Sequence, residues 1–222
     1  MTPVARRTAL VALALVAAIA GAAGYWWIAA RGARPPADVA GIAQVTTPAS
    51  PDIASTQLAE TVPAFELVDR AGQARSLQDW PGKALIVNFW ATWCAPCRRE
   101  IPLLQRIARE RAGDGFEVVG IAVDFRDKVL AYADEMQIEY PLLIGEQDAL
   151  DAAAAFGVEA IGFPFTIFSD RQGRIVYARM GELHEAEADL ILDEVVAVNG
   201  GTRTPAEARA RIEAGLPALQ HK

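Results

Sequence analysis

Apolar residues follow two patterns along the chain: one long uninterrupted run near the start, and a series of shorter segments further on. The run extends from Ala9 to Ala30 and contains no charged residue. Beyond about residue 58, apolar segments of strand length alternate with stretches in which apolar residues recur at helical spacing. This alternation predicts βαβ units built around parallel strands.

The clearest strand signals are Ala84–Trp90 and Phe116–Val123, which are continuous apolar runs typical of strands buried on both faces. A helix is predicted from Cys94 to about Arg111, because its apolar residues recur on one face. The same criteria predict shorter strands at Phe65–Leu67, Leu142–Ile144, Pro164–Phe168 and Arg174–Arg179, and helices at Arg126–Ile138, Asp148–Phe156 and Glu185–Val198.

The turn signal Asp170-Arg171-Gln172-Gly173 predicts a hairpin between the last two strands, which adds antiparallel pairing. Residues 59–199 should therefore form one α/β domain with a mixed central sheet flanked by helices. Residues 200–222 form a tail with a short helix of its own. Thr204 is its expected cap, Pro205 its first residue and Glu207 the partner in a capping box. We assign that tail no function.

The long apolar run predicts a single transmembrane helix over residues 9–30, which would rise roughly 33 Å. Tyr25, Trp26 and Trp27 lie near its far end, where aromatic side chains favour the membrane interface. We interpret the run as an uncleaved signal anchor that follows a short cytoplasmic N-terminus, residues 1–8. Residues 31–58 are rich in Ala, Pro, Ser and Thr and should form a flexible linker.

Other interpretations of the N-terminus remain open. A cleaved signal peptide usually has a shorter apolar region, but small residues such as Ala20 and Ala22 would permit cleavage. Arg6 and Arg7 on one side and Arg31 and Arg34 on the other give only a slight bias toward a cytoplasmic N-terminus. The Arg6-Arg7 pair resembles a twin-arginine export signal poorly.

Composition narrows the function classes. The chain has 222 residues with a net charge of −7 and a pI near 4.9, so a nucleic-acid partner, which requires a basic face, is not expected. Cysteine occurs only at positions 94 and 97, which excludes a scaffold of several structural disulfides. The fold must depend on its hydrophobic core.

The cysteines lie in Trp93-Cys94-Ala95-Pro96-Cys97, where a buried strand gives way to a helix. A cysteine at a helix N-terminus meets unpaired N–H groups and the helix dipole, which stabilise the thiolate. We expect Cys94, at the exposed turn, to attack a disulfide and Cys97, one turn inside the helix, to resolve the mixed disulfide. Pro96 suits the first helical turn.

Three other uses of the pair have weaker support. A structural zinc site needs about four ligands, but the chain adds only His184 and His221, both distant in sequence. A c-type haem site needs His after the second cysteine, where this chain has Arg98. A purely structural disulfide across two residues would close too small a loop to stabilise much. We expect no metal and no cofactor.

Two further positions are candidates for the site. Glu100 follows Cys97 by three residues and shares its helix face, so it could accept the proton of Cys97. It could equally be a first-turn acid that complements the helix dipole. Pro164 opens a strand, where proline is ordinary and a cis bond is the minority state. Arg98 and Arg99 are expected to be solvated surface charges.

These motifs together resemble the TlpA/ResA-like family of membrane-anchored thiol–disulfide oxidoreductases, members of the thioredoxin superfamily with an AhpC/TSA-redoxin-like domain. The resemblance spans about residues 59–199 and is most specific from Asn88 to Pro102. It also includes Val62-Pro63-Ala64-Phe65, Gly82-Lys83, Gly162-Phe163-Pro164 and Asp170. The fold it implies is thioredoxin-like.

The resemblance implies that Pro164 is a cis-proline beside the dithiol and that Glu100 acts near it. It also implies a substrate surface that includes Trp93, Pro96, Phe163 and Pro164. Members of this family work outside the cytoplasmic membrane, usually as reductants of exported proteins such as apocytochromes c or metallochaperones. A membrane electron donor of the DsbD/CcdA type commonly re-reduces them. The implied location is the inner membrane, single-pass, with the catalytic domain on the periplasmic side.

The chain departs from related patterns at several positions. Thioredoxin has a buried Asp six residues before its first active-site cysteine, where this chain has Asn88, as is common in the TlpA/ResA-like family. Asn is no base, so proton handling would shift toward Glu100. Phe165 stands where Thr is frequent and could reshape the substrate groove. The peroxiredoxin motif Pro-x-x-x-Thr/Ser-x-x-Cys is not met, since Ala91 occupies its Thr/Ser position.

The sequence therefore favours a protein-disulfide reductase. An apolar rim around the dithiol would be formed by Trp90, Trp93, Phe163 and Phe165, although aromatic residues in such places are as often part of the core. Two alternatives use the same cysteines. One is a binding module that holds a soft ion such as Cu(I). The other is an enzyme that runs in reverse as a disulfide donor.

Overall fold

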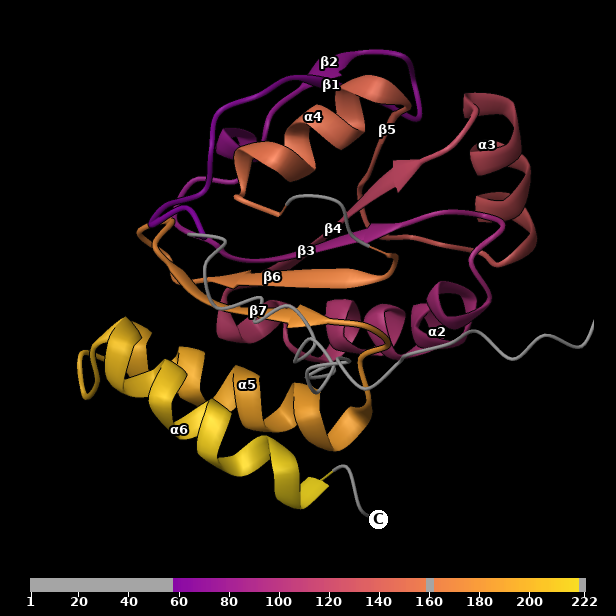
Figure 1. Ribbon diagram of the computed structural model, residues 1–222. Coiled ribbons are helices and arrows are strands. Elements are labelled where there is room, and N and C mark those ends of the chain that lie inside the picture. The colour runs from indigo at the N-terminus through magenta and orange to yellow at the C-terminus, as the bar shows by residue number, and fades with distance from the viewer. Residues whose placement is uncertain (1–57, 159–161, 220–222) are drawn as a thin grey trace, which may run out of the picture. The chain divides into compact units, whose positions relative to one another are not determined.

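The computed structural model describes residues 58–158 and 162–219 (Figure 1). The expected cytoplasmic N-terminus, the transmembrane segment 9–30 and all of the linker except residue 58 lie outside these ranges. Among the helices of the described ranges, none is long and apolar enough to cross a membrane.

A seven-stranded mixed sheet forms the centre of the described part, in the order β2-β1-β5-β4-β3-β6-β7 (Figure 1). The three strands β3, β4 and β5 are parallel, whereas β6 and β7 on one side and β1 and β2 on the other are antiparallel additions. This is the predicted mixed sheet. The strands are β1 (Leu67–Asp69), β2 (Ala74–Arg75), β3 (Ala84–Trp90), β4 (Phe116–Val123), β5 (Leu142–Gly145), β6 (Phe165–Ser169) and β7 (Ile175–Met180).

Helices cover both faces of the sheet. α4 (Gln147–Ala155) belongs to the core on one face, and Figure 1 shows it on the opposite side of the sheet from α5 and α6. The core on the other face is larger and takes side chains from α2 (Ala95–Glu110), α3 (Arg126–Glu135), α5 (Glu185–Asn199) and α6 (Pro205–Leu219).

Strand β3 is buried along its whole length because both of its faces are covered. Successive side chains of a strand point to opposite faces. Accordingly Leu85, Val87 and Phe89 enter the core under α4, while Ile86 and Trp90 enter the core under α2 and α5. Asn88 has the parity of Ile86 and Trp90, so this polar side chain also points toward α2.

Every predicted helix and strand of this domain is present, with ends displaced by at most three residues. The first strand was predicted two residues too early, because pairing of Val68 and Asp69 with β5 decides where it forms. α3 ends at Glu135 rather than near Ile138, since Gln137 adopts a left-handed conformation with φ 51° that a helix cannot contain.

The C-terminal helix is longer and better integrated than the short tail helix expected. α6 runs from Pro205 to Leu219, and the predicted capping box is present at Thr204 and Glu207. Its residues Ala208, Ile212 and Leu216 belong to the same core cluster as α2 and α5. The described part of the tail is thus packed into the domain.

Candidate active site

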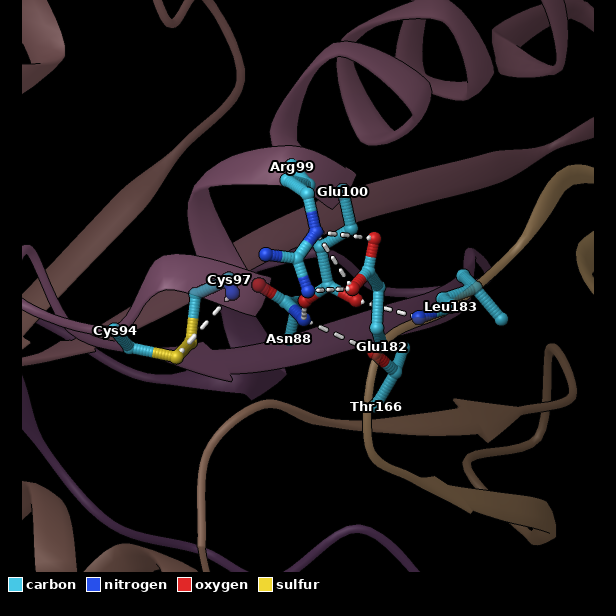
Figure 2. Close-up of a disulfide and its surroundings, with 8 residues drawn as sticks. All are labelled: Asn88, Cys94, Cys97, Arg99, Glu100, Thr166, Glu182 and Leu183. Carbon is cyan, nitrogen blue, oxygen red and sulfur yellow. Dashed lines mark hydrogen bonds and ion pairs between the residues drawn. A yellow bond between two sulfur atoms is a disulfide. The ribbon is translucent and has the colours of Figure 1, made fainter.

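The two cysteines lie directly after β3, where the chain leaves the sheet and enters α2 (Figure 2). Cys94 is the N-cap residue of α2, and the backbone N–H of Cys97 donates to Cys94 Sγ over 3.2 Å. The two residues form a disulfide with a Cα–Cα distance of 5.3 Å. The sulfur of Cys94 therefore sits where helix N–H groups stabilise a negative charge.

Both cysteines are more enclosed than the predicted exposed turn suggested. Cys94 is 4% exposed and Cys97 fully buried, so only the order of exposure agrees with the prediction. The exposed residues are instead Trp93 and Ala95, the two neighbours of Cys94. A partner that reaches the Cys94 sulfur must therefore contact these side chains as well.

The other predicted substrate-surface residues lie at the same end of the sheet as the dithiol, but Pro164 is buried rather than on the surface. The Phe163–Pro164 peptide is cis, as the resemblance implied, and Pro164 directly precedes β6. β6 starts with Phe165, which pairs with Phe89 near the end of β3, so Pro164 lies at the end of the sheet from which the cysteines emerge. Trp93 and Phe163 meet edge to face with ring centroids 5.9 Å apart. Pro96 occupies the first turn of α2.

The predicted aromatic rim is wrong for two of its four members. Trp90 is fully buried, and its ring centroid lies 5.7 Å from that of Tyr132 on α3. Phe165 is 1% exposed and stacks on Phe89 with centroids 4.4 Å apart, so it belongs to the core and does not reshape a groove. Both residues lie within strands whose two faces are covered, which apolar character alone could not distinguish from a rim. Trp93 is exposed, and Phe163 is half-buried at the edge of both core clusters.

Glu100 is a buried carboxylate on the second turn of α2, with 1% of its surface exposed. Asn88 Nδ2 donates to Glu100 Oε1 over 2.7 Å, and the backbone N–H of Leu183 donates to Oε2 over 2.7 Å (Figure 2). Asn88 Nδ2 also lies 3.0 Å from Thr166 Oγ1 on β6. Two separate segments thus donate to the carboxylate, and Thr166 contacts the Asn88 amide that makes one of these hydrogen bonds.

The environment of Glu100 favours a proton on its carboxyl group. Burial raises its pKa from 4.5 to about 7, against the hydrogen bonds from Leu183 and Asn88, which lower it. The negative charge of Glu182 adds to the rise, and the positive charge of Arg179 opposes it. A carboxyl group that titrates near neutral pH can both accept and release a proton under ordinary conditions.

The surroundings of Glu100 include residues that the sequence interpretation missed. Leu183 and Glu182 come more than eighty positions after Glu100 and carry no motif. Arg99 was expected to be a solvated charge, but it forms a two-pronged ion pair with Glu182 (Figure 2). Thr166 could have been found only by aligning β6 with β3, where it pairs with Asn88.

Within residues 58–158 and 162–219, no three His, Cys, Asp or Glu side chains are grouped so that they could hold a metal ion.

Comparison with known proteins assigns the chain to a family. The model of the AhpC/TSA family matches residues 58–178, more than half of the chain. The chain belongs to the AhpC/TSA family. The match begins at the first described residue and ends within β7, so it contains both cysteines, Glu100 and Pro164.

Individual relatives of known class support this assignment. Thioredoxin-like protein YneN of Bacillus subtilis (strain 168) is 34% identical over 141 residues, which cover 62% of this chain and 79% of YneN. Thiol-disulfide oxidoreductase ResA of Geobacillus thermodenitrificans (strain NG80-2) is 32% identical over 116 residues, which cover 52% of this chain and 64% of ResA. The predicted TlpA/ResA-like membership is confirmed, and so is the class of enzyme, a thiol–disulfide oxidoreductase.

A solved structure supports the same fold. The crystal structure of a thiol:disulfide interchange protein of the thioredoxin family from Chlorobium tepidum TLS matches with a TM-score of 0.55 at 32% identity. The match covers 61% of this chain and 95% of that one. The thioredoxin-like α/β fold is therefore shown for the described domain.

Proposed function

We propose that this AhpC/TSA-family enzyme reduces disulfides of exported proteins through its Cys94–Cys97 dithiol, with Glu100 handling the proton of Cys97. The observation that carries the proposal is that the N–H of Cys97 donates to Cys94 Sγ, while the buried Glu100 carboxyl group, whose pKa burial raises to about 7, follows Cys97 by one helical turn. The first feature favours a thiolate that attacks, and the second favours a base for the thiol that resolves.

The reaction proceeds in two exchange steps. In the first, the Cys94 thiolate attacks one sulfur of the substrate disulfide, forms a mixed disulfide and releases the other substrate sulfur as a thiolate. In the second, Cys97 gives its proton to the Glu100 carboxylate and attacks the sulfur of Cys94. The mixed disulfide breaks, the second substrate thiolate leaves, and Cys94 and Cys97 remain joined. Two electrons have passed from the enzyme to its substrate.

The surface beside Cys94 would receive the substrate. Trp93 and Phe163 offer aromatic faces there, and Pro164 lies at the end of the adjacent strand. Apocytochromes c awaiting haem and oxidised metallochaperones are the substrates that the resemblance suggests. We propose that the apolar run 9–30 anchors the domain on the periplasmic side of the inner membrane. A membrane electron donor of the DsbD/CcdA type would then return the disulfide to the dithiol.

A trapping experiment tests the proposal. In the full chain carrying Cys97→Ser, the mixed disulfide on Cys94 cannot resolve, so covalent adducts should accumulate in native membranes. The matched control carries Cys94→Ser as well and should trap nothing. We expect non-reducing electrophoresis and mass spectrometry to identify exported, cysteine-containing proteins. Adducts with cytosolic proteins alone, or equal adducts in the control, would contradict the proposal.

A further inference from the structure

An ion pair lies immediately beside the Glu100 carboxylate. Arg99 Nε lies 2.9 and 3.1 Å from the two carboxylate oxygens of Glu182, and Arg99 Nη2 makes a further contact with Glu182 Oε2. Arg99 directly precedes Glu100 on α2, and Glu182 directly precedes Leu183 in the loop after β7 (Figure 2). Glu100 and Leu183 are themselves joined by a hydrogen bond. The pair therefore joins the two segments that this hydrogen bond also joins.

The same residues line a pocket of about 310 Å³ that reaches Glu100. Its lining includes Arg99, Glu100, Arg106, Glu182, Leu183 and Glu185. The cysteines, Trp93, Phe163 and Pro164 are not among these lining residues. The pocket thus leads to Glu100 from a side other than the dithiol surface, which a bound substrate would cover.

Charges face Glu100 from several elements. Glu182 and Arg99 approach from the loop after β7 and from α2, and Arg179 approaches from β7. Arg179 is itself held by Glu187 of α5, with Nη2 2.9 Å from Glu187 Oε1. Tyr140, which precedes β5, is fully buried and stays neutral because burial raises its pKa. Asn88 and Leu183 contribute uncharged donors. Glu182 is thus the one carboxylate among the groups acting directly on Glu100 within the described residues, and Arg99 neutralises it.

We propose that Arg99 and Glu182 are positioning residues that set the pH at which Glu100 takes up the proton of Cys97. The inference deepens the proposed function and rests on it for the role of Glu100. A negative charge near Glu100 that has no ion-pair partner favours the protonated carboxyl group. A positive charge without a partner favours the carboxylate. Because Arg99 pairs with Glu182, the two charges partly offset each other beside Glu100.

The proposal predicts that substitutions of the two partners shift the titration of Glu100 in opposite directions. In Arg99→Gln the charge of Glu182 is left uncompensated, so Glu100 should release its proton at higher pH. In Glu182→Gln the charge of Arg99 is left uncompensated, so Glu100 should release its proton at lower pH. If the ion pair acted only by holding the loop in place, the loop would loosen in both variants and water would reach Glu100. The pH at which Glu100 releases its proton would then shift in the same direction in both variants.

The experiment follows the Glu100 carboxyl resonance by carbon-13 NMR titration in the full oxidised chain, with Glu100→Gln used to assign the peak. We expect shifts of about half a pH unit in opposite directions, since both partners are partly exposed. Both shifts should shrink at high salt because exposed charges are screened. Unchanged midpoints, or shifts of the same sign, would overturn the proposal.

The chain offers a matched control. Arg106 and Glu185 form a second ion pair between α2 and α5 that lines the same pocket, with a distance of 2.8 Å. Arg106→Gln and Glu185→Gln should leave the midpoint of Glu100 unchanged. The rate at which a mixed disulfide on Cys94 resolves is then measured against pH. If the resonance shifts in the Arg99 and Glu182 variants while that rate profile does not, the positioning holds and the proposed role of Glu100 fails.

Discussion

Glu100 is the residue on which structure and chemistry depend most closely. A carboxyl group with 1% exposure would destabilise the fold if it were always charged, although Asn88 and Leu183 each donate a hydrogen bond to it. A raised pKa resolves this conflict, because the group can be neutral below neutrality and charged above it. The same property suits it to exchange a proton with Cys97.

The shift in pKa makes a prediction about stability. Because the pKa in the folded protein lies above the unfolded value, the contribution of Glu100 is fully present below about pH 4.5 and is lost as pH rises through about 7. The shift from 4.5 to about 7 corresponds to roughly 3 kcal/mol. We expect Glu100→Gln to remove most of this pH dependence and to stabilise the oxidised protein at pH 8.

Urea unfolding at pH 5 and pH 8 measures this effect. Glu185→Gln is the control, since the Glu185 side chain is 64% exposed and its removal should leave the pH dependence intact. Equal pH dependence in Glu100→Gln and the unmodified protein would show that Glu100 titrates as an ordinary carboxyl group.

Trp93 permits a test of the substrate surface. It is 67% exposed, so Trp93→Ala should change the free energy of unfolding by no more than about 0.5 kcal/mol. For a protein substrate that packs against it, we expect kcat/KM to fall about tenfold, as for an aromatic contact residue. A small soluble disulfide should be reduced at an almost unchanged rate. Equal losses on both substrates would argue against a docking role.

At the scale of elements, the position of Cys94 follows from a strand and a helix that the sequence predicted well. Ala84–Trp90 is apolar throughout because both its faces are covered, and α2 shows its buried stripe in Ile101, Leu104 and Ile107. The rim residues were harder to predict. An aromatic residue such as Trp90 has the same character in a core as beside a site, and only the burial of β3 on both faces separates the two.

The C-terminal helix gives a prediction at this scale. Glu207 N–H donates to Thr204 Oγ1 over 3.2 Å, and α6 packs into the domain core through Ile212. Thr204→Ala removes the cap, so we expect a loss of about 1 kcal/mol and a fall in Tm of about 2–4 °C. Thr204→Ser retains the hydroxyl group and should remain near the unmodified value. A Tm unaffected by Thr204→Ala would mean that α6 contributes little to the cooperative unit.

At the scale of the whole molecule, the site is assembled from segments that the sheet brings together. β3 and β6 are adjacent, so Asn88 meets Thr166 across the sheet, and the loop after β7 reaches the start of α2. The sequence could predict the cysteines and Glu100 because they lie together in one short motif. It could predict the cis-proline because the chain resembles a known family. The Leu183 and Glu182 contacts were not predictable, since they depend on the register of strands far apart in sequence.

The proposed membrane anchor gives a further prediction for the whole molecule. The uncharged run 9–30 leads us to expect that the full chain sediments with membranes and resists extraction by alkaline carbonate. A chain that lacks residues 1–30 should appear in the soluble fraction and still exchange disulfides, because none of the described site residues lies in that segment. Recovery of the full chain in the soluble fraction would contradict the proposed location.

The most direct test of the account measures how fast a mixed disulfide between Cys94 and a peptide resolves at pH values from 5 to 9. In the unmodified protein, the rate should rise with pH and pass its midpoint near 7, where Glu100 becomes able to accept the proton of Cys97. In Glu100→Gln the rate should be much lower near neutrality and should lose that midpoint. If both proteins gave the same profile, Cys97 would be losing its proton without Glu100, and the central claim would be wrong.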